Sequence, residues 1–204
     1  MSPAFVLEPT YDTLRRRILT GAWPSGHRIE AARLAAELGV SVTPVRDSLN
    51  RLAGERLVHA SPGAGYQVPL LDETELRGLI DWHHGLVAIA LRSSEAEAMG
   101  VTIPQGHDGV GERTALLFAS IAGVARNREL DWTIANVAAR LGAYRRHEEV
   151  VLGDAVAELE QLELLAREGD RNQLAQAVEH YHGRRHAAAA ELVHAARSAD
   201  FPDE

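Results

Sequence analysis

Apolar residues recur at helical spacing along most of this chain, and the pattern predicts a mostly α-helical protein. In the N-terminal third, residues 31–38 carry one short apolar stripe, and Val45, Leu49 and Leu52 form the next. Gly39 lies between the two stripes, and glycine adopts at little cost the left-handed backbone that ends a helix. Two short helices joined by a tight turn are typical of a helix-turn-helix, whose second helix enters the DNA major groove.

Two residues mark the start of the second helix. Ser41 is a good N-cap, because its hydroxyl can accept a hydrogen bond from a free amide of the first turn. Pro44 falls in that first turn, where a missing amide hydrogen costs nothing. The face opposite the apolar stripe is polar and can reach a partner; it carries Thr43, Arg46, Asn50 and Arg51.

Further elements flank this pair of helices. A first helix is predicted over residues 11–20, with Arg15 in a basic run that is either a solvated face or a phosphate contact. The other expected elements are a strand at 28–29 and a hairpin of 57–60 and 66–69 around a glycine-containing turn. Helix, helix-turn-helix and hairpin in this order make a winged helix.

The remainder of the chain shows no strand pattern, and an all-α bundle is its natural architecture. The expected helices span residues 73–98, 112–125, 130–151, 155–168 and 171–198. We therefore predict a winged helix-turn-helix domain at 1–69, a hinge at 70–74 and an all-α helical bundle at 75–204.

Charge and composition refine this prediction. The net charge is −8, but residues 1–70 hold eight arginines against six acids, whereas the remainder holds thirteen against twenty-three. A mildly basic head on an acidic body fits a DNA-binding domain followed by one that does not bind DNA. The chain has no cysteine, no apolar run of the ~20 residues that a membrane span needs, and no signal-peptide pattern. We therefore expect a cytoplasmic protein without membrane contact.

Residues 11–68 resemble the DNA-binding domain of the GntR family of bacterial transcription regulators. The resemblance rests on the motifs Ile18-Leu19-Thr20-Gly21, Pro24-Ser25-Gly26, Leu34-Ala35-Ala36-Glu37-Leu38-Gly39-Val40-Ser41, Thr43-Pro44-Val45-Arg46 and Gly63-Ala64-Gly65. It implies a winged helix that binds an operator, and a transcription regulator rather than an enzyme.

The resemblance also implies which residues meet DNA. Arg46 is expected to read a base edge, because arginine can bind guanine with two hydrogen bonds. The alternative for Arg46 is a salt bridge to Asp47, to Glu37 or to a partner subunit. Ser41 and Thr43 are expected to hold phosphates. The full set expected at the DNA is Ser41, Thr43, Pro44, Arg46, Asn50, Arg51, Gly63, Gly65 and Arg15.

Three positions depart from the family. Ala32, Val42 and Ala64 stand where many members carry arginine or, at the latter two, lysine as well. Fewer phosphate contacts imply weaker binding, a shallower salt dependence or a different operator.

A GntR-type head followed by an all-α body resembles the FCD class, to which the fatty-acid regulator of the family is related. Many FCD domains hold a divalent metal that binds a carboxylate effector. The matching positions in this chain are Ala115, Ala119, Leu159 and Tyr181, which do not suit a metal. We therefore expect a degenerate metal site and no cofactor.

The histidines leave a rival hypothesis open, in which His83 or His84 joins His182 and His186 in a different metal site. Paired histidines on helices are more often surface residues. The polar residues expected at an effector pocket are His83, His84, Arg140, Tyr144 and Tyr181. Aromatic residues that could line it include Trp82, Phe118 and Trp132.

Together these observations predict a homodimeric DNA-binding regulator. The resemblance to the family further implies a repressor that is modulated by a small carboxylate effector. The alternative is a regulator whose C-terminal domain only dimerises and binds no effector. We do not expect an enzyme, because the sequence shows no nucleophile with a paired base, no phosphate-cradling glycine motif and no complete metal set.

Overall fold

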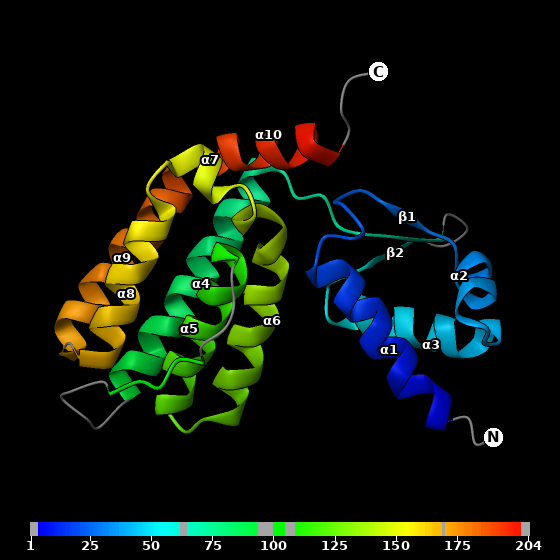
Figure 1. The fold of residues 1–204 in the computed structure, drawn as a ribbon, viewed down its shortest axis with the longest axis horizontal. Coiled ribbons are helices and arrows are strands. Elements are labelled where there is room, and N and C mark those ends of the chain that lie inside the picture. Colours follow the sequence, from blue (N-terminus) through cyan, green and yellow to red (C-terminus); the bar gives the residue numbers. More distant parts are fainter. Residues whose placement is uncertain (1–3, 62–64, 94–99, 105–108, 169, 201–204) are drawn as a thin grey trace. The chain divides into compact units, whose positions relative to one another are not determined.

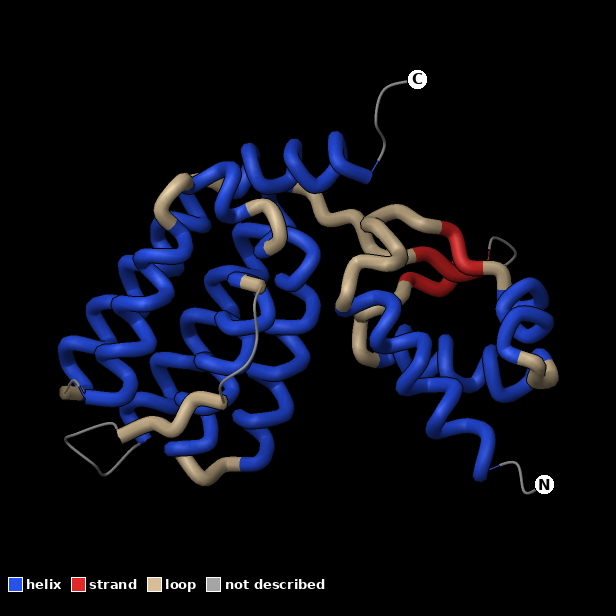
Figure 2. The backbone as a smooth tube through the Cα atoms, viewed as in Figure 1, coloured by secondary structure: helices blue, strands red, loops and turns tan. Residues whose placement is uncertain are grey.

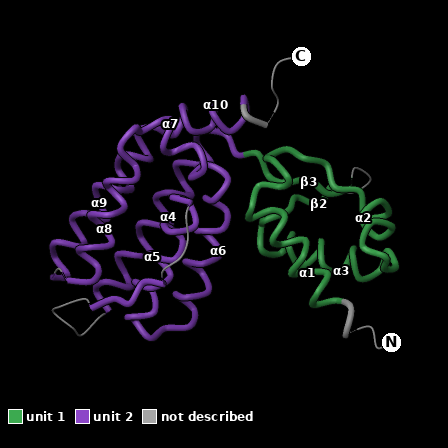
Figure 3. Tube along the Cα trace, viewed as in Figure 1, with its two compact units in different colours: residues 1–70, 200–204 green, residues 71–199 purple. Residues whose placement is uncertain are grey.

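The structure, a computed structural model, describes residues 4–61, 65–93, 100–104, 109–168 and 170–200 of the 204-residue chain. The chain divides into two compact units, residues 1–70 with 200–204 and residues 71–199 (Figure 3). The first combines helices with a small antiparallel sheet, and the second is helical (Figure 2). The predicted fold class, a winged helix-turn-helix followed by a helical bundle, is confirmed.

The first unit is built around two packed helices and a sheet. Its helices are α1 (Ala4–Leu19), α2 (Ala31–Leu38) and α3 (Val42–Gly54), and its strands are β1 (Arg28–Ile29), β2 (His59–Ser61) and β3 (Gly65–Gln67). The strand order is β1-β3-β2, and Tyr66 of β3 pairs with Ile29 on one side and with Ala60 on the other. α1 packs against α3, and the fully buried Leu14, Leu49 and Leu52 come from these two helices.

The turn between α2 and α3 follows the sequence signals. Gly39 is left-handed, with φ 66° and ψ 31°, as predicted. Ser41 occupies the N-cap in an extended conformation, although its hydroxyl makes no capping hydrogen bond. The first helix begins earlier than predicted and continues through Pro9. A proline near a helix start removes only a hydrogen bond to the first residues, where helices fray.

The second unit is a bundle of α4 (Glu73–Ser93), α5 (Val110–Val124), α6 (Arg128–Arg145), α7 (Glu148–Leu152), α8 (Ala155–Glu168), α9 (Arg171–Ala187) and α10 (Ala189–Asp200). α4 packs against α5, α6 and α9, and α8 packs against α5 and α9 (Figure 1). The start of α4 is fixed by a reciprocal capping box. Asp72 Oδ1 accepts from the Glu75 amide at 2.8 Å, and Glu75 Oε2 accepts from the Asp72 amide at 2.9 Å.

Two predicted helices are wrong in length, because each is interrupted. Residues 130–151 form α6 and α7 with a break at Arg146 and His147, and residues 171–198 form α9 and α10 with a break at Ala188. Neither break contains glycine or proline, so the sequence carries no stop signal there. The first break is associated with a tertiary contact, since Glu148 at the start of α7 pairs with a buried arginine of α9. Among the described residues, no helix is both long and apolar enough to cross a bilayer.

Candidate nucleic-acid interface and buried cavity

The polar face of α3 is open to solvent. Ser41, Thr43 and Arg46 are exposed, whereas Val45 and Leu49 on the opposite face have no exposed surface. Within the part of the chain that the structure describes, Arg46 has no ion pair or hydrogen bond. Glu37, one of its candidate partners, is instead bound by Arg17 at 2.6 Å. The intrachain salt bridge considered for Arg46 is therefore not formed, and its guanidinium is available to a partner.

Arg51 belongs to a cluster that ties α3 to α1. Its guanidinium carbon lies 3.8 Å from the centre of the Tyr11 ring, and its nitrogens lie 2.9 Å from Glu8 and 3.7 Å from Glu55. The Tyr11 hydroxyl donates to Glu55 at 2.7 Å. Burial, together with Glu55, raises the pKa of Tyr11 to about 12. These contacts stabilise the unit, and a role for Arg51 at DNA stays a prediction.

Asn50 joins α3 to the hairpin. Its side-chain oxygen accepts a hydrogen bond from the Tyr66 hydroxyl of β3 at 2.8 Å. Gly65, at the start of β3, has φ 82°, a conformation that favours glycine. This geometry couples the hairpin to the helix that would enter the groove.

The remaining residues expected at DNA differ in their surroundings. Arg15 lies 4.0 Å from Glu55, and Pro44 is half-buried. Gly63 lies outside the described residues. One residue that sequence reasoning missed is Arg33 on α2, which is exposed and has no ion pair or hydrogen bond with any described residue. It adjoins Ala32, the position where many members of the family carry arginine. Its place next to that position could have marked Arg33 as a candidate DNA contact.

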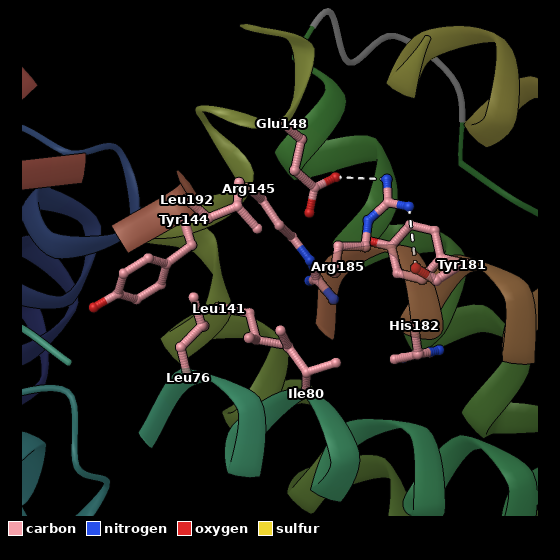
Figure 4. A pocket seen from close by; sticks show the side chains of 10 residues that line it. All are labelled: Leu76, Ile80, Leu141, Tyr144, Arg145, Glu148, Tyr181, His182, Arg185 and Leu192. Atoms are coloured by element: carbon pink, nitrogen blue, oxygen red, sulfur yellow. Dashed lines mark hydrogen bonds and ion pairs between the residues drawn. The ribbon is translucent and has the colours of Figure 1, made fainter. Parts of the chain in front are cut away.

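A narrow cavity lies inside the helical unit (Figure 4). It offers about 20 Å³ to the centre of a water-sized sphere, and ~10–15 Å³ by this measure already admits one water. Part of the cavity wall is apolar, and the rest is polar. They comprise Leu76, Ile80, Leu141, Tyr144, Arg145, Glu148, Tyr181, His182, Arg185 and Leu192.

Two buried arginines at this cavity have different partners. Arg185 binds Glu148 at 2.8 Å, pairs also with Glu158, and donates to the Tyr181 carbonyl at 3.2 Å. Arg145 donates from Nη1 to the Ala138 carbonyl at 3.4 Å, and its Nη2 has no hydrogen-bond partner among the described residues. Glu148, the carboxylate that lines the cavity, is therefore paired with Arg185, and Arg145 forms no ion pair with a described carboxylate.

The hydroxyl groups of the two tyrosines at the cavity have different surroundings. The Tyr144 hydroxyl accepts from the Leu71 amide at 2.8 Å, at the first residue of the helical unit. The Tyr181 hydroxyl is buried, and the guanidinium of Arg145 is the neighbouring group that hydrogen-bonds to it. Burial raises the pKa of Tyr181, an effect that the nearby Arg145 partly offsets, so the phenol is a neutral O–H donor.

Buried histidines form a short hydrogen-bonded run beside the cavity. His182 Nδ1 lies 2.7 Å from the Val178 carbonyl and must donate to it, so His182 Nε2 is the acceptor. His83 Nδ1 lies 2.8 Å from that Nε2 and donates, which leaves His83 Nε2 as a buried acceptor without a partner among the described residues. Burial lowers the pKa of His83 well below its usual value and lowers the pKa of His182 to about 3, so both rings are neutral.

The rival metal site is not formed. His84 stacks on His182 with ring centres 5.1 Å apart, while His186 lies 3.6 Å from Asp81. Over the described ranges, no group of three His, Cys, Asp or Glu side chains is arranged to hold a metal.

The structure brings some of the expected effector residues together. Tyr144 and Tyr181 line the cavity, and His83 contacts its wall through His182. His84 lines a different, more open cavity with Arg92 and Arg171, and Arg140 lines neither of these two. Trp82 and Trp132 line neither of these two cavities and are not core residues either, because their exposed fractions are 53% and 60%.

Sequence reasoning missed Arg145 and Arg185, although a signal existed. Arg145 continues the apolar stripe of α6 after Leu141 and Tyr144, and Arg185 continues the stripe of α9 after Tyr181. An arginine on an apolar stripe is rarely buried without a purpose.

Comparison with known proteins identifies the first unit. The profile of the family described as "Bacterial regulatory proteins, gntR family" matches residues 8–68. The chain carries a GntR-family helix-turn-helix domain. The match begins within α1, ends just after β3 and contains Arg46.

Two relatives of this chain carry the names of transcription regulators. One is an uncharacterized HTH-type transcriptional regulator of Agrobacterium vitis, from the TAR-I ttuE-ttuC' intergenic region, which is 26% identical over 137 residues. That alignment covers 67% of this chain and 77% of the relative. Another is the HTH-type transcriptional regulator McbR of Escherichia coli, 32% identical over 80 residues, or 38% of this chain and 36% of McbR.

Solved structures share the fold over nearly the whole chain. E. coli McbR/YncC superposes with a TM-score of 0.69 at 17% identity, covering 91% of this chain and 97% of that one. A putative GntR regulator from Rhodococcus sp. RHA1 has a TM-score of 0.73 at 17% identity, with the same coverage. The chain, its helical unit included, thus shares the fold of these two solved structures.

Proposed function

We propose that this GntR-family transcription regulator is a homodimeric repressor whose operator binding is modulated by a small carboxylate ligand. The DNA-binding part of the proposal is supported by Arg46, which is exposed on α3 and free of any described intrachain partner. An arginine held on the polar face of a recognition helix can read guanine with two hydrogen bonds.

The proposal divides the chain by task. Residues 1–69 bind double-stranded DNA, 70–74 act as a hinge, and 75–204 form an FCD-like domain for dimerisation and effector binding, acting in the cytoplasm. A dimer is required because one recognition helix reads one half-site, and a palindromic operator presents two.

A route for ligand control is suggested by the neighbouring roles of two consecutive residues. Arg145 lines the cavity, and Tyr144 holds the Leu71 amide at the beginning of the hinge. A ligand that shifts α6 would alter this hydrogen bond. Control of DNA binding requires that the ligand bind the two hinge arrangements with different affinity.

Selection of operators from random DNA, followed by affinity measurements, tests the DNA-binding part. Arg46→Ala is expected to weaken operator binding by about 1–3 kcal/mol and to relax the preference at one base pair. Arg128→Ala, an exposed arginine at the start of α6, is the matched control and should leave binding unchanged. Failure of the wild-type protein to prefer any sequence over scrambled DNA at low salt would overturn the proposal.

The second candidate is a regulator whose C-terminal domain only dimerises. It is favoured by Ala115, Ala119 and Leu159, which replace the metal ligands expected in the FCD class. Thermal denaturation with a panel of small carboxylates separates the two, because a ligand that binds only the folded state must raise the melting temperature. The dimerisation-only candidate predicts no increase with any of them.

A further inference from the structure

We propose that two copies of this chain pair through the exposed face of α4, with the two helices antiparallel and Trp82 of each copy packed on Gly85 of the other. The inference rests on the proposed homodimer, and it adds the surface, the direction of pairing and the register. It is argued from the order of large, small and charged residues along this one helix.

The exposed face of α4 carries a stripe with heptad spacing. All its members are exposed, and their separation alternates between three and four residues; they are Glu75, Gly78, Trp82, Gly85, Ile89 and Arg92. This alternation is the seam along which two helices pack side by side at a shallow angle. The buried face of α4 packs within the bundle, so the stripe is a second seam that points outward.

Two large apolar side chains lie on this stripe. Trp82 and Ile89 are 53% and 39% exposed and stand about two helical turns apart on one face. Apolar groups gathered on an exposed face mark interaction sites, and tryptophan is among the residues that most often anchor a protein interface. A second copy laid along the stripe would remove both side chains from water.

The order of large and small residues fixes the register. In an antiparallel pair centred between Trp82 and Gly85, each Trp82 meets Gly85 of the partner, and each Ile89 meets Gly78 of the partner. A Cβ on either glycine would meet no described atom within 4 Å, so both leave room that a partner's side chain can fill. Glycine within a helix is destabilising relative to alanine, and the described residues give no steric reason for it at these two positions.

Charge selects the antiparallel direction. With the same centre, Glu75 lies opposite Arg92 of the partner at both ends of the seam. The capping bond of Glu75 uses Oε2, and the carboxylate offers a second oxygen. A parallel pair would instead place Glu75 on Glu75, Arg92 on Arg92 and Trp82 on Trp82, which repels at both ends and leaves the glycines facing each other. The face is therefore self-complementary about a two-fold axis, as a symmetric dimer requires.

Cysteine crosslinking tests the register, because the chain has no cysteine of its own. The double variant Gly78→Cys/Ile89→Cys places two thiols opposite each other at two symmetric points of the dimer. Within one chain these positions lie roughly 16 Å apart along the helix, too far for a disulfide. Mild oxidation of the full chain should convert the double variant to a covalent dimer on a denaturing gel and leave each single variant monomeric.

Gly85→Leu tests the packing. The added side chain occupies the room assigned to Trp82 of the partner, twice per dimer, so sedimentation equilibrium should show a dimer weakened on the order of 100-fold. Folding is not threatened, because leucine favours a helix more than glycine does. The matched control is Gly183→Leu, at an exposed glycine of α9 whose Cβ would also meet no described atom within 4 Å. It should leave dimerisation unchanged.

Three outcomes would overturn the proposal. Efficient crosslinking of Gly78→Cys alone would show another register or direction. Equally tight dimers of Gly85→Leu and wild type would exclude this face and leave the proposed homodimer intact on a different surface. A wild-type chain that stays monomeric at its highest soluble concentration would refute the homodimer together with this face. Operator selection with the same preparations tests DNA recognition separately, since a single head can still bind a half-site.

Discussion

Arg145 and Arg185 are equally buried, yet the same substitution to methionine is predicted to change stability in opposite directions. Arg185→Met leaves Glu148, with an exposed fraction of 2%, as an unpaired buried charge. Breaking a buried pair in this way costs about 3–5 kcal/mol. Arg145→Met leaves no described carboxylate without a partner and removes a desolvated cation.

The size of the Arg145→Met effect follows from what that side chain loses. Replacing buried ionic groups by apolar ones of similar volume stabilises by about 1–4 kcal/mol in favourable cases. The lost bond to the Ala138 carbonyl is long, at 3.4 Å, and the Phe118 ring centre is 5.7 Å away. Together with the lost hydrogen bond to Tyr181, these contacts offset only part of the gain. We expect a net gain of about 1–2 kcal/mol in the ligand-free protein. A chain of this size shifts by roughly 2–4 °C per kcal/mol.

Calorimetry in carboxylate-free buffer measures both variants against the wild type. The melting temperature of Arg145→Met should rise by roughly 2–8 °C, and that of Arg185→Met should fall by roughly 6 °C or more. Comparable destabilisation in the two variants would refute the reasoning, because it would mean that Arg145 is compensated as fully as Arg185.

Further predictions concern the rest of the molecule. Arg51→Ala should destabilise the first unit by about 1–2 kcal/mol through loss of the Tyr11 and Glu8 contacts, and an unchanged melting temperature would contradict this. Gly39→Ala should cost about 1 kcal/mol in denaturant unfolding because its φ is 66°, although the space around its Cβ is open; a neutral effect would contradict the strain. Because folding lowers the pKa values of His83 and His182, the stability they contribute should be complete above about pH 6.5 and be lost as the pH falls toward 3; a melting temperature that stays constant from about pH 7.5 to 5 would argue against it. Operator affinity should fall only shallowly with salt, since Ala32 and Val42 offer no cation, and a slope implying ~10 phosphate contacts would contradict this.

Local sequence signals predicted the helix-turn-helix well, because the residues that set each helix end and each buried face lie within a few positions of one another. Gly39 sets a turn that few other residues adopt, and the stripe of Val45, Leu49 and Leu52 fixes the buried face of α3. Asp72 and Asp170 accept from amides three residues on, so the starts of α4 and α9 are also encoded locally. Where both partners of a capping hydrogen bond lie within one helical turn, the sequence was sufficient to predict where the helix begins.

The cavity could not be predicted in the same way, because its chemistry depends on partners far apart in the chain. Arg185 meets Glu148 across 37 positions, and His83 meets His182 across 99. Helical periodicity places Arg145 on the buried face of α6, but it cannot say that the available carboxylates go to Arg185. The break before Glu148 is associated with the same long-range contact, which helical periodicity does not reveal.

The run from the Val178 carbonyl through His182 to His83 has a fixed direction. A carbonyl oxygen can only accept, so the sense of both rings is decided at a backbone atom on α9, one turn before His182. Reversing the direction of these two hydrogen bonds would require a donor at the Val178 carbonyl, which can only accept. Glutamine at position 182 retains one hydrogen-bond donor and one acceptor, as the neutral imidazole ring does. Leucine at that position preserves neither and isolates His83 from the backbone that orients it.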